Sequence, residues 1–152
     1  MDTGFAPIGL DEPYRIVVGN NPVNFVDPLG LWRSPWDIYN DALKDAQARY
    51  PTSSLHNGLG DAYRHCLASC MMTKENGVVS AEAFGWANEK RGDWTHNQEC
   101  GERAMDDANN QKGRDIGLTT GNTSDCANQC LNAANRGDLT TYTSGTTPGY
   151  WY

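Results

Sequence analysis

Long hydrophobic segments are missing from this 152-residue sequence. Its mean hydropathy is −0.66, and no apolar run approaches the roughly 18 residues that a membrane-spanning helix needs. The opening stretch MDTGFAPIGLDEPYR contains Asp2, Asp11 and Glu12, so it lacks the charged-then-apolar pattern of a secretory signal peptide. We therefore expect a chain without a transmembrane segment, which leaves a cell by a route that needs no such leader.

Basic residues are scarce relative to acidic ones. The chain has 12 Lys and Arg against 19 Asp and Glu, which gives a formal net charge of −7 and a pI near 4.8. Proteins that bind phosphate backbones generally do so through clustered Lys and Arg. Nucleic acid is therefore a disfavoured partner, although an acidic nuclease that uses a metal ion remains an alternative.

Proline separates two parts of the chain. Pro7, Pro13, Pro22 and Pro28 interrupt residues 1–31, where YRIVVG is the β-like run. Further on, start signals of Ser and Pro and stop signals of Gly and Pro predict five helices, at 34–51, 59–77, 80–92, 97–117 and 124–137. The length and pattern predict an all-α domain, a compact bundle of about five helices preceded by an extended segment. The tail, 138–152, is expected as a strand pair or a docked end.

Four of the five cysteines form two pairs with i, i+4 spacing. Cys66 and Cys70 fall in one expected helix, and Cys126 and Cys130 fall in another, so each pair lies on one helical face. Two disulfides could join these helices, either Cys66–Cys130 with Cys70–Cys126 or Cys66–Cys126 with Cys70–Cys130, and short connections favour the first, antiparallel, arrangement. Free buried thiols and a zinc site are the alternatives. Disulfides would indicate work outside the reducing cytosol and leave Cys100 unpaired.

The segment GNNPVNFVDPLGL, residues 19–31, resembles the end of the core of RHS/YD-repeat proteins, the shells that carry polymorphic toxins. In that family a DPxGL motif, at which the chain can be cut, ends the shell, and a variable toxin domain follows. The resemblance implies a shell remnant over 1–31 and a toxin domain over 32–152. It further implies delivery by a type VI-like secretion route and a cognate immunity protein that blocks the toxin.

The cleavage-type motif of this segment consists of Asp27, Pro28, Gly30 and Leu31. A second motif of the same form is expected upstream in the family, and APIGL, at residues 6–10, resembles it with Ala6 in the place of Asp. Asp27 then lacks its carboxylate partner, so self-cleavage after Leu31 is left open.

Residues 61–117 resemble an uncharacterised domain family found at the C-termini of such toxins. The matching elements are DAYRH, with Asp61, Arg64 and His65, then Glu89 in WANEK, and finally DDANNQKGR. The last element supplies four polar residues on or beside one helical face: Asp106, Asn109, Asn110 and Arg114. One departure is Asn88, which stands where a His often precedes the Glu, so no role of that His carries over.

His65 has the surroundings of a general base or a metal ligand. Asp61 lies one turn earlier on the expected helix, where its carboxylate can fix the imidazole tautomer and raise its basicity. Ser69, one turn later, is a poor triad nucleophile, because three residues stacked along one helix rarely reach hydrogen-bond geometry in series. A His that only contacts Asp61 within a polar helix interface is the alternative.

Glu82 and Glu89 flank Trp86 on one side of an expected helix. An aromatic ring beside a carboxyl group desolvates it, which suits a general acid, although an ordinary amphipathic helix has the same pattern. We expect His65, Glu89 and Asp106 to converge as catalytic groups, or to hold a divalent metal. The expected substrate-binding or orienting residues are Asp61, Arg64, Asn109, Asn110 and Arg114.

These features predict an antibacterial toxin domain that hydrolyses the target-cell envelope, with the periplasm as the favoured location. Peptidoglycan is the first choice, because the acidic charge disfavours nucleic acid and paired acids beside an aromatic suit glycosidic or amide hydrolysis. A phospholipase, a metal-dependent nuclease and a non-enzymatic toxin or binding module are the alternatives.

Overall fold

The computed structural model describes residues 33–96 and 100–143, with all of their side chains except those of residues 89–96. The chain divides into two units, residues 1–31 and 32–152, and all described residues belong to the second. The RHS-like segment, with Asp27, Pro28, Gly30 and Leu31, therefore lies outside the described residues. So does the tail after residue 143.

Five α-helices and one short 3₁₀ turn make up the described part of the chain. They are α2 (Pro35–Arg49), η1 (Thr52–Ser54), α3 (Leu59–Asn76), α4 (Val78–His96), α5 (Cys100–Thr119) and α6 (Ser124–Arg136). No strand occurs among these residues, and the predicted all-α bundle of about five helices is confirmed. None of the described helices is both long and apolar enough to cross a bilayer.

The start of α4 differs from the prediction, since the helix begins at Val78 and not after Ser80. Gly77 ends α3 with a φ of +87°, a conformation that glycine adopts without a steric penalty. Its carbonyl oxygen accepts a hydrogen bond from the Ala81 N–H at 3.1 Å. The glycine that ends one helix thus also begins the next, and no capping Ser is needed.

Two glycines that were expected to end helices lie within them. α4 continues past Gly92 to His96, and α5 continues past Gly117 to Thr119. A glycine inside a helix costs only about 1 kcal/mol relative to alanine. At Gly117 the absence of a side chain lets α3 approach, because an added Cβ would lie 2.7 Å from Thr73 Cβ.

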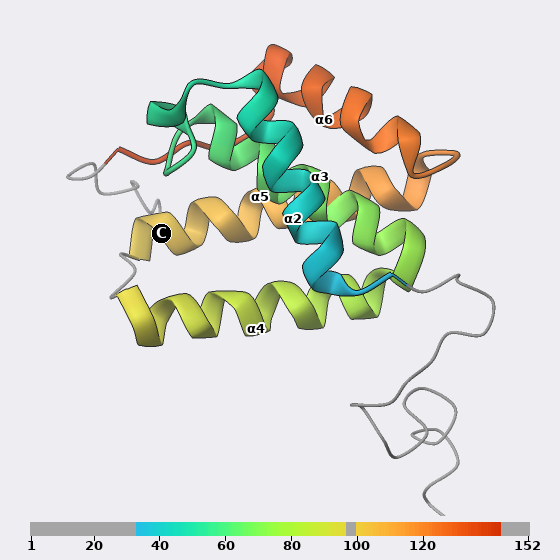
Figure 1. Ribbon diagram of the computed structural model, residues 1–152, viewed down its shortest axis with the longest axis horizontal. Helices are drawn as coiled ribbons and strands as arrows, with labels where there is room; N and C mark the ends of the chain where they lie inside the picture. The colour runs from blue at the N-terminus through green and yellow to red at the C-terminus, as the bar shows by residue number, and fades with distance from the viewer. Residues whose placement is uncertain (1–32, 97–99, 144–152) are drawn as a thin grey trace, which may run out of the picture. The chain divides into compact units, whose positions relative to one another are not determined.

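α3 is the central helix and contacts each of the other four α-helices (Figure 1). Its buried apolar residues pack against small residues of α2 and α6: Ala42, Ala46, Cys126, Cys130, Ala133 and Ala134. A second apolar cluster of Ile38, Met72 and Ala81 joins α2, α3 and α4. The core is therefore built from small side chains that allow the helices to lie close together.

Two disulfides fix α3 to α6. They join Cys66 to Cys130 and Cys70 to Cys126, so the two helices run antiparallel. The disulfide prediction is confirmed, with the connectivity that short connections favoured, and free thiols or zinc at these four cysteines are excluded. Cys100 is a free, exposed cysteine.

α3 and α5 run parallel, because their contacts advance in the same direction along both helices. Ser69 meets Asn110, and further along Thr73 meets Gly117. In the same interface an added Cβ at Gly113 would lie only 2.2 Å from the backbone oxygen of Cys66. This close approach brings polar residues of both helices into one buried interface.

Residues 138–143 lie against the bundle and form no strand pair. Asn109 Nδ2 donates to the Thr140 carbonyl at 2.8 Å, and the Thr140 N–H donates to Asn109 Oδ1 at 2.9 Å. The Tyr142 N–H donates to the Asn57 carbonyl at 2.8 Å. Within the described part of the tail, the docked alternative is therefore the one observed.

Candidate functional site

The interface between α3 and α5 buries a stripe of polar side chains. They are Asp61, His65, Ser69 and Thr73 on α3, spaced one turn apart, and Asp106, Asn109 and Asn110 on α5. Each is at most 7% exposed. Burying ionisable groups costs free energy unless they are paired, and such clusters are enriched at functional sites. This stripe is therefore the candidate functional site.

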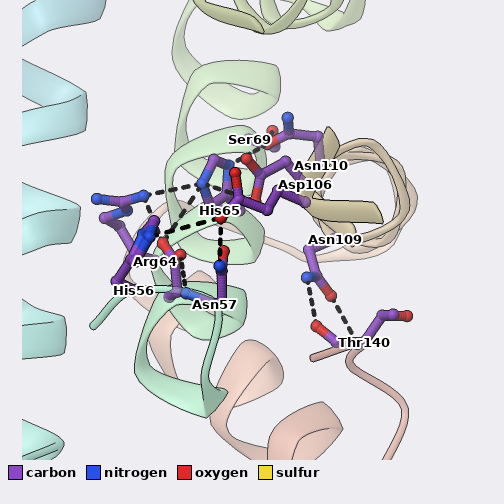
Figure 2. A network of polar contacts seen from close by, with 11 residues as sticks. His56, Asn57, Arg64, His65, Ser69, Asp106, Asn109, Asn110 and Thr140 are labelled. Atoms are coloured by element: carbon purple, nitrogen blue, oxygen red, sulfur yellow. Dashed lines mark hydrogen bonds and ion pairs between the residues drawn. The ribbon is translucent and has the colours of Figure 1, made fainter. Parts of the chain in front are cut away.

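His65 lies at the centre of the stripe (Figure 2). Its Nε2 atom is 3.2 Å from Asp106 Oδ1 and 3.5 Å from Asp61 Oδ1, and its Nδ1 atom is 3.3 Å from Asn110 Oδ1. Ser69 donates to the same Asn110 oxygen at 3.0 Å. An amide oxygen can only accept, so Nδ1 carries the proton of the neutral imidazole. The Nε2 lone pair then faces the two carboxylates.

Asp61 is held in the first turn of α3, where the helix dipole favours a negative charge. Its Oδ2 atom accepts a hydrogen bond from the backbone N–H of Asn57 at 2.7 Å. Asn57 has a φ of +61°, in the left-handed region that Asn tolerates better than most residues. Its side chain donates to Glu102 of α5, and His56 Nε2 lies 3.5 Å from the same oxygen. The loop before α3 therefore connects Asp61 to α5.

Arg64 supplies a positive charge beside the two carboxylates. Its Nη2 atom donates to Asp61 Oδ1 and lies 2.9 Å from His65 Nε2. The guanidinium carbon lies 5.3 Å from the centre of the Tyr39 ring, within the range of a cation–π contact. Since Nε2 has a lone pair, the guanidinium is its hydrogen-bond donor and partly neutralises the site.

The pKa of His65 is lowered from its ordinary value to about 4. Burial is the largest cause and the positive charge of Arg64 adds to it, whereas Asp61 and the hydrogen bond with Asn110 act in the opposite direction. The imidazole is therefore neutral at pH 7. A neutral imidazole can accept a proton or bind a metal ion.

Asp61, His65 and Asp106 could also hold a divalent cation. One oxygen of each carboxylate and a ring nitrogen of His65 lie within 4.8 Å of one another. Such a nitrogen and oxygen donor set suits zinc or manganese, and the contact between Nδ1 and Asn110 is of the kind that orients metal-binding histidines. Arg64 Nη2 lies among the same atoms, so a cation would have to displace it.

Two adjoining pockets open beside this cluster. The inner pocket, of about 20 Å³, is lined by the polar residues His65, Ser69, Asn88 and Asn110 and by Tyr39, Ala68, Met72, Ala81, Phe84 and Gly85. The outer pocket, of about 170 Å³, is lined by Glu82, Gly85, Trp86, Arg103, Asp107, Asn110 and Arg114. Gly85 of α4 and Asn110 of α5 line both. The inner pocket has room for a water molecule beside His65.

The structure gathers five of the residues that the sequence predicted for the site: Asp61, Arg64, His65, Asp106 and Asn110. The predicted metal set contained Glu89, but its side chain lies outside the described residues, and the observed donor group has Asp61 in that place. The cluster therefore comes from α3 and α5.

Two predicted residues lie away from His65. Asn109 points toward Thr140, and both polar atoms of its amide bond the backbone there (Figure 2). Arg114 lines the outer pocket and donates to Gln111 Oε1 at 2.7 Å. Although both residues lie within four positions of Asn110 in the sequence, Asn109 bonds the segment that follows α6 and Arg114 faces the neighbouring pocket.

Three residues of this region were missed by the sequence-based prediction: Asn57, Tyr39 and Phe84. The dipeptide of Asn57 and Gly58 is a turn signal that could have suggested the left-handed residue before α3. In the sequence, Tyr39 and Phe84 have the pattern of ordinary core residues in two separate helices. Their position beside His65 follows from helix packing, which leaves no local signal.

Comparison with known proteins assigns the domain that contains this cluster to a sequence family. Residues 28–138 match the family described as "Domain of unknown function (DUF6973)". The chain belongs to this family. The DUF6973 match includes all of the cluster residues from α3 and α5.

A relative of known sequence is the uncharacterised protein YlbH of Escherichia coli (strain K12). It is 30% identical over 162 residues, an alignment that covers 85% of this chain. The chain spans 64% of the length of YlbH. No solved structure matches the chain.

Proposed function

We propose that this DUF6973 domain is an antibacterial toxin carried by an RHS shell, and that it hydrolyses a component of the target-cell envelope. The enzymatic part of the proposal rests on the cluster of Asp61, His65 and Asp106, of which His65 lines a pocket. A neutral imidazole beside two carboxylates and a space for water has the arrangement of a general base. Delivery by a shell rests on the sequence of residues 19–31.

His65 is the base in this mechanism. Arg64 Nη2 donates to its Nε2 atom and has to move away before that atom can act. Nε2 then removes a proton from a water molecule, and the water oxygen attacks the substrate. Asp61 and Asp106 stabilise the imidazolium that forms, and Asn110 holds the ring through Nδ1. The imidazolium then returns the proton to the leaving group.

An oxidising compartment fits this domain best. The disulfides Cys66–Cys130 and Cys70–Cys126 are stable where thiols are not kept reduced. The net charge of −7 also disfavours the nucleic acids of the cytosol. The periplasm satisfies both conditions and gives access to peptidoglycan and to membrane lipids.

Bacterial expression of the full chain tests the toxin proposal. We expect weak killing without an export signal, strong killing when such a signal is attached, and protection by a cognate immunity protein encoded beside the toxin gene. Colony counts and microscopy of the envelope measure the outcome. Harmless expression in both compartments would contradict the proposal.

The substitution His65→Gln tests the catalytic assignment. It keeps a polar side chain but removes the base, so we expect killing to fall by about 10²-fold or more. His56→Gln is the matched control, because His56 also lies beside an acidic residue but its side chain is 83% exposed, and killing should be unchanged. Circular dichroism checks that both variants fold. Full killing by a folded His65→Gln variant would rule out His65 as the base.

A further inference from the structure

The outer pocket combines charges of both signs in one hollow. Arg103 and Arg114 line it together with Glu82 and Asp107, and Trp86 lies beside them. Arginine binds phosphate groups through paired, charge-assisted hydrogen bonds, and carboxylates accept hydrogen bonds from ammonium groups. The pocket therefore complements a small group that carries both a phosphate and an ammonium.

The inner pocket places both apolar and polar side chains around the candidate base. Tyr39 and Phe84 line it together with Ser69, Asn88 and Asn110. An ester bond next to its acyl chain presents both kinds of atom, because the ester oxygens accept hydrogen bonds and the chain makes apolar contacts.

Of the exposed large apolar side chains of the described residues, Trp86 lines the outer pocket, and Trp36 contacts Phe84 of the inner pocket. The full set consists of Trp36, Val78, Val79, Trp86 and Leu118, and all but the last belong to α4 or the first turn of α2. Val79 is 75% exposed and Trp86 is 62% exposed, and their spacing of seven residues puts them on one face of α4. Trp36 packs edge-on against Phe84 at 5.3 Å. Tryptophan is typical of surfaces that meet a membrane interface.

We propose that the outer pocket binds the headgroup of a zwitterionic phospholipid and that the domain hydrolyses an acyl ester of this lipid. The proposal rests on the hydrolase function given above and names its substrate as phospholipid in place of peptidoglycan. Arg103 and Arg114 bind the phosphate, and Glu82 and Asp107 accept the ammonium. Trp36, Val79 and Trp86 contact the bilayer around the entrance.

The bond that is cut follows from the order of the pockets. Because Gly85 and Asn110 line both, a headgroup in the outer pocket leaves the ester bond of the lipid at the boundary of the inner pocket, whose volume of about 20 Å³ holds the attacking water. Once Arg64 has moved off Nε2 of His65, water loses a proton to this atom and its oxygen bonds to the acyl carbon. The bond from that carbon to the glycerol oxygen breaks, and the proton passes to that oxygen. One ester and one water thus give one fatty acid and one lysophospholipid.

The overall charge supports a zwitterionic lipid over an anionic one. At −7 the chain is repelled by a bilayer of anionic lipids, whereas phosphatidylethanolamine has no net charge. We expect vesicles of phosphatidylethanolamine to release fatty acid and lysophospholipid faster than vesicles of phosphatidylglycerol. Mass spectrometry of the lipids after incubation with the full chain measures both products.

The variants Arg114→Gln and Trp86→Ala test the two contacts separately. Loss of a charged hydrogen bond to phosphate should slow vesicle hydrolysis about tenfold or more, while Trp86→Ala should lower vesicle co-sedimentation. Arg136→Gln is the control for charge, since Arg136 lies on α6 beside Asp138. Leu118→Ala is the control for exposed apolar area. Both controls should retain wild-type rates and binding.

The outcomes separate this inference from the proposed function. If the exported chain kills in a His65-dependent way but leaves both kinds of vesicle intact, the lipid assignment is overturned and the hydrolase proposal stands. Release of soluble fragments from purified sacculi would then identify peptidoglycan. Equal vesicle hydrolysis by Arg114→Gln and Arg136→Gln would overturn the headgroup site. Lipid products that depend on both His65 and Arg114 would support the inference.

Discussion

His65 takes its chemical properties from residues on two helices. Asp61 and Arg64 belong to its own helix, whereas Asp106 and Asn110 come from α5. Burial and the charge of Arg64 lower the pKa of His65, whereas Asp61 and the hydrogen bond with Asn110 raise it. Burial and Arg64 have the larger effect, so the pKa of His65 lies below its ordinary value. The side chain is therefore kept neutral in a place where its protonated form has partners close by.

The lowered pKa of His65 predicts a pH-dependent stability. An unfolded His titrates near 6.5, while the folded pKa is about 4, so the unfolded state binds the proton more readily. The stabilising contribution is fully present above pH 6.5 and is lost as the pH falls toward 4, by about 3 kcal/mol in the free energy of unfolding. Urea denaturation between pH 7 and pH 4 measures this loss.

A comparison of variants separates His65 from the carboxylates that titrate in the same range. His65→Gln should show a smaller loss of stability over this range, and His56→Gln should lose as much as the wild type. NMR titration of the folded wild type gives a direct check. An imidazole of His65 that titrates at or above 6.5 would contradict the prediction.

At the scale of the elements, two glycines set the distance between α3 and α5. An added Cβ at Gly113 would lie 2.2 Å from Cys66 O, and one at Gly117 would lie 2.9 Å from Cys70 O. These contacts are with backbone atoms, which cannot rotate away. The same two cysteines are joined to α6 by disulfides, so α3 has little freedom to move.

Gly113→Ala should therefore destabilise the domain. Overpacking of this kind costs about 1–3 kcal/mol, which outweighs the gain in helix propensity of up to about 1 kcal/mol. Gly121→Ala is the matched control, because an added Cβ there would lie 3.6 Å from Asp125 Oδ2, an ordinary contact. Urea denaturation compares the two, and equal stability of both variants would show that α3 and α5 can separate at no cost.

At the scale of the whole molecule, the disulfides connect early and late parts of the chain. Their sequence separations are 64 and 56 residues, for which the chain-entropy argument gives roughly 4 kcal/mol for a single bond. The Cys70–Cys126 loop lies inside the Cys66–Cys130 loop. Once one bond has formed, the ends of the other are already close, so the pair contributes well below twice that amount.

Reduction should therefore weaken the whole domain. Thiol counting on denatured, unreduced protein should find one free cysteine, Cys100, and five after reduction. The midpoint of urea denaturation should fall when a reductant is added, because the free energy of unfolding drops by at least the roughly 4 kcal/mol expected for one bond. Five free thiols in air-exposed protein, or an unchanged midpoint, would contradict the prediction.

The helix boundaries that were predicted correctly follow from the local spacing of residues in the sequence. Pro35 at the start of α2 and Gly137 after α6 stand where helix signals placed them, because capping depends on neighbouring residues alone. The prediction that a glycine ends the helix is wrong at Gly92 and Gly117, because both helices continue past them. Packing against α3 accounts for the second failure, and a single sequence does not contain that contact as a local pattern.

The all-α class, the two cysteine pairs and the shared face of Asp61 and His65 could all be predicted from the order of residues. Each depends on periodicity along one helix, which the order of residues specifies. The tertiary structure alone decided that Asp106 and Asn110 meet His65, that Asn109 turns to Thr140, and that Tyr39 and Phe84 wall the inner pocket. These contacts depend on which faces of separate helices meet, and that is settled by the packing of the whole bundle.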